Sequence, residues 1–159
     1  MKKKLQLIID VDGVLTDGSF IYDNKGKIFK KFGPHDSDGI KIIKKFIDVF
    51  LISADKRGYE ISKKRAEDIG LKIFYVPEEN RYNFFEKIGF KKCIFIGDGH
   101  YDAEILKKVY YGIAPQNAVE KCKKNSNYVT KVNGGNGAVY EACLHIMKKF
   151  KFKLNENKI

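Results

Sequence analysis

The chain has few cysteines, no long apolar run and a shortage of acidic residues, and each shortage excludes a class of protein. Its three cysteines, Cys93, Cys122 and Cys143, are far apart with no Cys-x-x-Cys pair. We therefore expect reduced structural thiols in a cytoplasmic protein rather than a disulfide framework. No apolar stretch approaches the ~20 residues of a membrane-spanning helix, so no membrane partner is expected.

Acidic residues are outnumbered, 20 against 31 Lys and Arg, which leaves a formal net charge of +11. The lysines are dispersed in pairs such as Lys30-Lys31 and Lys148-Lys149, a pattern typical of solvated helical faces. A positive field would steer an anionic substrate and would hold nucleic acid weakly. No recognised nucleic-acid-binding motif accompanies the charge, so nucleic acid is not expected as a partner.

What the chain does contain is enough apolar material for one globular domain spanning residues 1–159. Hydrophobic residues make up 43% of it, with 12 Phe and 9 Tyr, which excludes a disordered protein. Short apolar runs alternate with amphipathic segments, which predicts an α/β fold with a doubly wound parallel sheet and right-handed crossovers. Strands are expected over residues 5–10, 48–54, 72–76, 92–96, 110–114 and 128–130, and helices over 40–47, 57–69, 78–88, 103–109, 117–124 (capped by Asn117) and 138–150.

A β-hairpin is predicted directly after the first strand. Two strand-like runs, residues 19–22 and 27–32, flank a turn that contains Gly26. Its position suggests a flap over a site or a contact between subunits. The aromatic residues in these runs could equally be ordinary core packing: Phe20, Tyr22, Phe29 and Phe32.

The most informative stretch is residues 5–18, LQLIIDVDGVLTDG. A buried parallel strand appears as a short apolar run, and here that run ends at Asp10. Asp12 lies two positions later on the same face, and Gly13 permits a sharp turn. A calcium-binding loop is excluded because Val14 and Leu15 occupy the positions of its third ligand and its glycine. A solvated acidic turn is the remaining structural alternative.

Asp10, Ser53 and Asp98 each follow a predicted buried strand, so folding would bring them to one edge of the sheet. Phosphoryl transfer needs a nucleophile, a proton donor and a metal. Asp10 can form an aspartyl-phosphate, and Asp12 can protonate the leaving oxygen and then activate water. Asp10, Asp98 and the backbone carbonyl of Asp12 would suit Mg²⁺. Taken singly, Ser53 and Asp102 are weak signals, since both residue types often begin helices.

The motifs resemble those of the haloacid dehalogenase superfamily, in its capless 3-deoxy-D-manno-octulosonate 8-phosphate phosphatase branch. The resemblance covers nearly the whole chain and implies no cap domain, a role in lipopolysaccharide biosynthesis, and homotetramers whose hairpins associate while neighbouring chains help to close each site. The segments that carry it are DVDGVLTDG, the hairpin, DSDGI, ISAD, GDGHYD, NYVT and GGNGAVYEAC.

The resemblance also implies roles for individual positions. It makes Asp10 the nucleophile, Asp12 the acid/base and Asp98 a metal ligand for Mg²⁺. Ser53 occupies the position of the phosphate-binding hydroxyl. Basic positions that hold the anionic substrate correspond to Arg65 and Lys41.

The chain departs from the family pattern at four positions. Arg81 stands where lysine usually neutralises the phosphate and the nucleophile, so the charge is kept with a different geometry. Lys87 is a further candidate for that charge. His35 and Asn136 each replace an arginine, and Asp55 replaces a basic residue after the second motif.

We therefore expect a Mg²⁺-dependent phosphatase acting on a small 2-keto-3-deoxy sugar-acid phosphate. A nine-carbon nonulosonate 9-phosphate is an alternative substrate that the stretch of His35, Asp36 and Ser37 would also suit. An alternative of another class is a catalytically weak, basic binding or scaffold domain.

Overall fold

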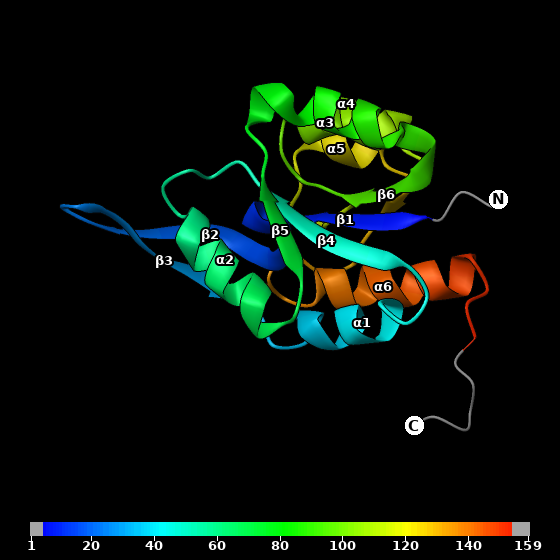
Figure 1. Ribbon diagram of the computed structural model, residues 1–159, viewed down its shortest axis with the longest axis horizontal. Helices are drawn as coiled ribbons and strands as arrows, with labels where there is room; N and C mark the ends of the chain where they lie inside the picture. The colour runs from blue at the N-terminus through cyan, green and yellow to red at the C-terminus, as the bar shows by residue number, and fades with distance from the viewer. Residues whose placement is uncertain (1–4, 154–159) are drawn as a thin grey trace.

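The computed structural model describes residues 5–153, and a six-stranded parallel sheet runs through its middle (Figure 1). The strand order is β5-β4-β1-β6-β7-β8. This arrangement confirms the predicted doubly wound α/β fold. The strands are β1 (Gln6–Asp10), β4 (Asp48–Ser53), β5 (Lys72–Tyr75), β6 (Cys93–Ile96), β7 (Tyr111–Ala114) and β8 (Tyr128–Val129).

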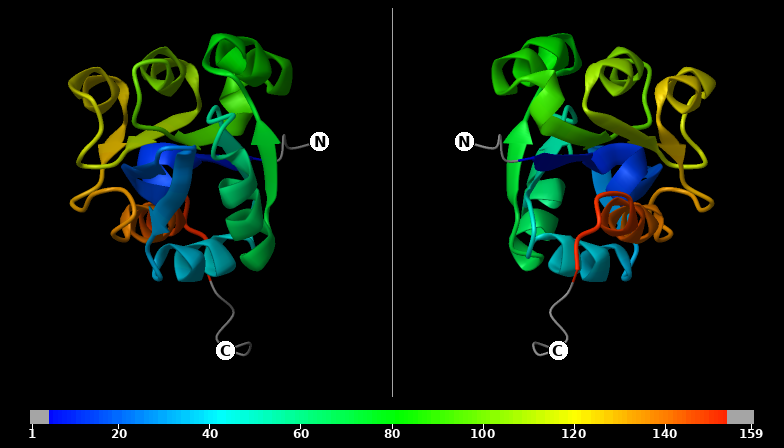
Figure 2. Two further views of the ribbon diagram at one scale, coloured as in Figure 1. Left: turned by 90° about the vertical axis from the view of Figure 1, so that its left-hand side faces the viewer. Right: turned by 90° about the vertical axis from the view of Figure 1, so that its right-hand side faces the viewer.

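Helices cover both faces of the sheet, and each face has its own apolar core (Figures 1 and 2). None of the helices in residues 5–153 combines the length and the apolar character that a membrane crossing needs. One face carries α1 (Asp36–Ile43), α2 (Tyr59–Asp68) and α6 (Ala138–Lys149), and the other carries α3 (Arg81–Ile88), α4 (Asp102–Lys108) and α5 (Glu120–Asn125).

β1 is central, and its pairing places the candidate residues at one edge. Its apolar residues are fully buried because the sheet is covered on both faces. In the register, Asp10 lies opposite Ile52 of β4, next to Ser53, and Ile9 lies opposite Ile96, the last residue of β6. The carboxyl ends of β1, β4 and β6 therefore lie side by side. This edge of the sheet carries Asp10, Ser53 and the loop that contains Asp98.

The predicted hairpin is present as β2 (Thr16–Asp23) and β3 (Gly26–Phe32), which project well beyond the helices (Figure 1). Phe20, Tyr22 and Phe29 are 44%, 53% and 60% exposed. Core packing is therefore the wrong interpretation for these three side chains. Phe32, at the base of the hairpin, does pack against the core.

Two smaller expectations have opposite outcomes. The three cysteines are free and buried, as expected. Asn117 does not cap α5, because that helix begins at Glu120 after Val119. The Asn117 side chain instead accepts a hydrogen bond of 2.9 Å from the backbone N–H of Gly134 and so fixes the glycine-rich loop before α6.

Candidate active site

A tight turn, Val11–Leu15, follows β1 and depends on glycine. Gly13 has φ +88°, and a Cβ built there would lie 2.1 Å from Oδ2 of Asp98. The hydroxyl of Thr16 accepts hydrogen bonds from the N–H groups of Gly13 (3.0 Å) and Gly18 (3.2 Å). The turn therefore lets the Asp98 carboxylate approach the backbone beside Asp10, a position that any side chain at residue 13 would block.

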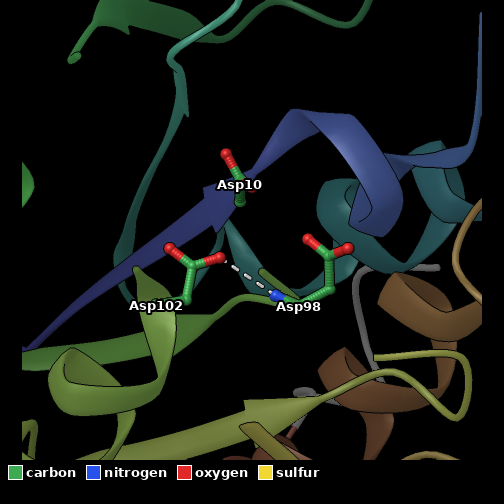
Figure 3. A group of neighbouring side chains, drawn as sticks. All are labelled: Asp10, Asp98 and Asp102. Atoms are coloured by element: carbon green, nitrogen blue, oxygen red, sulfur yellow. Dashed lines mark hydrogen bonds between the residues drawn. The ribbon is translucent and has the colours of Figure 1, made fainter. Parts of the chain in front are cut away.

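Three carboxylates gather at this edge of the sheet (Figure 3). Asp10 ends β1, Asp98 follows β6 and Asp102 begins α4, and one oxygen of each lies within 4.8 Å of the others. Asp102 Oδ2 accepts hydrogen bonds from the N–H groups of Asp98 (3.1 Å) and Gly99 (3.0 Å). Asp102 thus holds the loop that carries Asp98.

Arg81, the first residue of α3, joins two of these carboxylates. Its Nη2 lies 2.8 Å from Oδ1 of Asp10, and its Nη1 donates to Oδ1 of Asp102. The guanidinium is almost completely buried. Burial alone would lower the pKa of Arg81, but the charges of Asp10 and Asp102 outweigh it and raise that pKa, so the group stays cationic.

The cluster carries more negative than positive charge. Burial raises the pKa of Asp10 well above its usual value against the lowering effect of Arg81, and Asp102 and Asp98 raise it further. Burial and then the charge of Asp102 raise the pKa of Asp98 to about 7. A bound cation would relieve this repulsion. The donor set is entirely oxygen, which fits a hard divalent ion such as Mg²⁺.

The cavity above the cluster is small, about 120 Å³. Sites for drug-sized ligands span roughly 300–1,000 Å³, so this cavity has room for a group the size of a phosphate but not for a whole sugar acid. The residues that line it are Asp10, Asp12, Glu78, Arg81, Asp98, Gly99, His100, Tyr101 and Asp102.

Asp12 reaches the same cavity from the turn, with one oxygen in a hydrogen bond and the other in an ion pair. Oδ2 accepts a hydrogen bond of 2.8 Å from the buried hydroxyl of Ser53. Oδ1 lies 2.7 Å from Nζ of Lys30, a residue of the hairpin. The sequence brought Asp12 and Ser53 together through their strand ends. It missed Lys30, because nothing distinguishes this lysine from its neighbour Lys31 along the chain.

Five other candidates lie away from the cavity in this chain, among the residues that the structure describes. Their substrate-binding roles stay predictions. Lys87 lines a separate hollow beside Phe74. Lys41 is exposed and pairs with Asp38, Arg65 Nη2 donates to the carbonyl of Gly33 (3.4 Å), Ser37 donates to that of Pro34 (2.9 Å), and His35 lines a different cavity with Asn136 and Tyr140.

Asp36 has a structural role in this chain, and its contact with substrate stays a prediction. Its side chain is completely buried, and Oδ1 accepts a hydrogen bond of 3.1 Å from the backbone N–H of Tyr140 in the first turn of α6. A carboxylate at a helix N-terminus satisfies N–H groups that have no partner within the helix. Asp36 therefore joins α1 to α6.

Comparison with known proteins identifies the family of this chain. Residues 80–142 match the family described as haloacid dehalogenase-like hydrolase. The 3-deoxy-D-manno-octulosonate 8-phosphate phosphatase of Escherichia coli K12 is 31% identical over 144 residues, 86% of this chain and 76% of that protein.

Solved structures give the same result. The corresponding phosphatase of Moraxella catarrhalis, in complex with magnesium, phosphate and 3-deoxy-D-manno-octulosonate (KDO), has a TM-score of 0.80 at 29% identity, over 92% of this chain and 87% of that one. The cobalt-bound enzyme of Haemophilus influenzae has a TM-score of 0.77 at 29% identity, over 92% and 88%. The chain belongs to the haloacid dehalogenase-like hydrolases and is a phosphatase similar to the 3-deoxy-D-manno-octulosonate 8-phosphate phosphatases.

Proposed function

We propose that this phosphatase is magnesium-dependent and hydrolyses 3-deoxy-D-manno-octulosonate 8-phosphate or a closely related 2-keto-3-deoxy sugar-acid phosphate. The observation that carries the proposal is the contact of Arg81 with Asp10 beside Asp98, with Asp12 two residues further along. The relative from Moraxella catarrhalis, which holds magnesium, phosphate and KDO, supports the choice of substrate class.

In the proposed reaction, a carboxylate oxygen of Asp10 attacks phosphorus. The bond from phosphorus to the sugar oxygen breaks, and its electron pair stays on that oxygen. Asp12, as the carboxylic acid, donates the proton that completes the sugar hydroxyl, and an aspartyl-phosphate remains on Asp10. Water then gives a proton to Asp12 and attacks phosphorus. The acyl-phosphate bond breaks, which releases inorganic phosphate and restores the Asp10 carboxylate.

The groups around Asp10 would balance the negative charge of the phosphoryl group. Asp10, Asp98 and the backbone carbonyl of Asp12 would hold Mg²⁺, which supplies positive charge to the phosphoryl oxygens when bound. Asp102 orients its neighbours, since its oxygens already accept from Arg81 and from two backbone N–H groups. Arg81 acts as the fixed cation, and Ser53 offers its hydroxyl to a phosphate oxygen.

The size of the cavity also bears on assembly. Because about 120 Å³ holds only the phosphoryl group, the sugar acid must lie outside it, over the open edge of the sheet. We propose that a neighbouring chain covers that edge in a homo-oligomer, a tetramer by resemblance. Arg65, Lys41, His35 and Ser37 would then meet the substrate in the closed assembly.

One observation favours a second candidate, a nonulosonate 9-phosphate. His35 and Asn136, which both replace arginine, line the same cavity of about 510 Å³ together with Asp38 and Glu141. Smaller side chains in place of arginine would leave room there for the longer carbon chain of a nine-carbon sugar acid.

A turnover screen tests the proposal. Phosphate release is measured from eight- and nine-carbon keto-acid phosphates with Mg²⁺, with a chelator, and after Mg²⁺ is restored. We expect Mg²⁺-dependent release that favours one sugar acid over p-nitrophenyl phosphate. Release that is unaffected by the chelator would contradict the metal requirement, and no release from any phosphate ester would contradict the proposed function.

A further inference from the structure

Lys30 is a buried cation carried by an otherwise exposed element. Its side chain is 0% exposed, and within β3, which the structure describes in full, it is the one buried residue. Lysine is almost never fully buried unless it is paired. Nζ has three partners: Asp12 Oδ1 at 2.7 Å, Asp55 Oδ2 at 2.9 Å and Ser62 Oγ at 2.7 Å. The contact with Ser62 is a hydrogen bond, and the two carboxylates pair with the charge of the ammonium.

Asp55 fixes this lysine independently of Asp12. Oδ1 of Asp55 accepts the N–H of Gly58 (3.1 Å), and its own N–H donates to Ser53 Oγ (3.2 Å). Lys27, from the same hairpin strand, pairs with the Oδ2 atom that Lys30 contacts. Two lysines therefore balance two aspartates, and the ammonium of Lys30 is held between α2, the loop after β4 and the turn after β1.

One oxygen of Asp12 contacts the hairpin, and the other contacts a hydroxyl that also has a proposed role in phosphate binding. Lys30 contacts Oδ1, while the Ser53 hydroxyl donates to Oδ2. Ser53 is also the proposed phosphate ligand, and its single O–H proton can serve only one acceptor at a time. When the Ser53 hydroxyl donates to phosphate, Oδ2 of Asp12 loses its hydrogen-bond donor, while Oδ1 keeps its ion pair with Lys30.

We propose that Lys30 is a positioning residue that anchors Oδ1 of Asp12 and leaves Oδ2 to exchange the proton with the leaving oxygen. This inference rests on the proposed function, because it assigns an orienting group to the acid of that reaction. It also gives the hairpin a role inside the active site, through the one β3 side chain that is buried.

The effect of Lys30 on the rate should grow with the need of the leaving group for a proton. A p-nitrophenolate leaves without protonation, whereas a phenolate, a stronger base, depends on the acid. Loss of Lys30 should therefore slow phenyl phosphate more than p-nitrophenyl phosphate. A variant that is partly unfolded loses both activities by one factor, so the ratio of the two kcat/KM values is independent of the folded fraction.

The experiment compares Lys30→Met, Lys30→Arg and Lys31→Met in the full chain with saturating Mg²⁺. Lys31 is the matched control, since it is the next residue of β3 and its side chain is 69% exposed. We expect Lys30→Met to lower the phenyl to p-nitrophenyl ratio of kcat/KM roughly tenfold or more, a fraction of the ~10²–10⁴ of a general acid. Lys30→Arg, which keeps the charge, should restore part of the ratio, and Lys31→Met should leave it unchanged.

If Lys30→Met is insoluble, Asp55→Asn replaces it, because it loosens the same ammonium while keeping its charge. The expected change in the ratio is smaller and in the same direction. An unchanged ratio in a folded Lys30 or Asp55 variant would overturn the positioning role while wild-type turnover upheld the phosphatase. Absence of turnover in the wild type would instead contradict the proposed function itself.

Discussion

Two regions separated by only the Val11–Leu15 turn differ in almost every physical respect. Around Asp10, the polar side chains come from β1, α3, α4 and the loop after β6. They are largely buried and are joined by hydrogen bonds. The β2–β3 hairpin projects from the body and exposes its large apolar side chains. The first region therefore holds polar groups in fixed positions, and the second exposes an apolar surface.

The two regions should also respond differently to substitution. Removing one partner of a buried ion pair costs about 3–5 kcal/mol because it leaves the other charge uncompensated. Substitutions on an exposed surface usually change stability by less than about 0.5 kcal/mol. We therefore expect changes near Asp10 to affect chemistry and folding, and changes at the exposed side chains of the hairpin to affect assembly.

The largest effect is expected for Asp10→Asn, which should abolish turnover. An amide cannot attack phosphorus and is a poor ligand for Mg²⁺. Steady-state phosphate release measures the change, with Asp68→Asn, at an exposed pair on α2, as the control. Near-normal turnover by Asp10→Asn would exclude this mechanism.

Asp12→Asn should slow turnover of a poor leaving group by ~10²–10⁴, the usual cost of losing a general acid. Metal binding should be nearly intact, because the proposed ligand at this residue is the backbone carbonyl. Isothermal titration with Mg²⁺ and steady-state kinetics separate the two effects. A full rate with such a substrate would remove Asp12 from the mechanism.

Arg81→Ala should depress turnover by ~10²–10³, as expected when one charge stabiliser is lost. It should also lower the free energy of unfolding, since Asp10 and Asp102 would lose their shared partner. Arg81→Lys should keep much of the rate, and Lys87→Ala serves as the control. A harmless Arg81→Ala with a damaging Lys87→Ala would place the cation at Lys87 instead.

The sequence predicted some features of these two regions and missed others, for a physical reason. Apolar runs ending at Asp10 and Ser53 predicted the strands and the shared edge, because parallel strand ends converge whatever the details of packing. The burial of Asp36 and Lys30 could not be predicted in this way. The burial of Asp36 depends on α6, more than a hundred residues away, and that of Lys30 on how the hairpin lies against α2. The Asn117 cap was wrong because α5 begins only at Glu120, and the Asn117 side chain binds the N–H of Gly134 instead.

Substituting the exposed hairpin aromatics should change assembly more than folding. Tyr22→Ser with Phe29→Ser should lower the mass found by light scattering toward that of one chain, with little change in the melting temperature of the dissociated form. Leu144→Ser, at an exposed position on α6, is the matched control. A wild-type mass of one chain at micromolar concentration, with full activity, would contradict the oligomer.

The smallest effect concerns acid stability at the base of the hairpin. Burial raises the pKa of Asp55, but hydrogen bonds from Lys27, Lys30 and the N–H of Gly58 outweigh it and lower that pKa to about 2. The ordinary value is about 3.9, so the stabilisation is complete above about pH 4 and is lost as pH falls toward 2. Urea unfolding should show the gap between wild type and Asp55→Asn narrowing from about pH 6 to pH 3. A gap independent of pH would contradict this ionisation.

Chemical trapping tests the role of Asp10 most directly. Hydroxylamine converts an acyl phosphate to a hydroxamate, so enzyme turning over substrate with Mg²⁺ is treated with hydroxylamine, digested and mapped by mass spectrometry. We predict a hydroxamate at Asp10 that requires both substrate and Mg²⁺ and disappears in Asp10→Asn. Continued turnover with no adduct at Asp10, or with the adduct on another carboxylate, would contradict the assignment of Asp10 as the nucleophile.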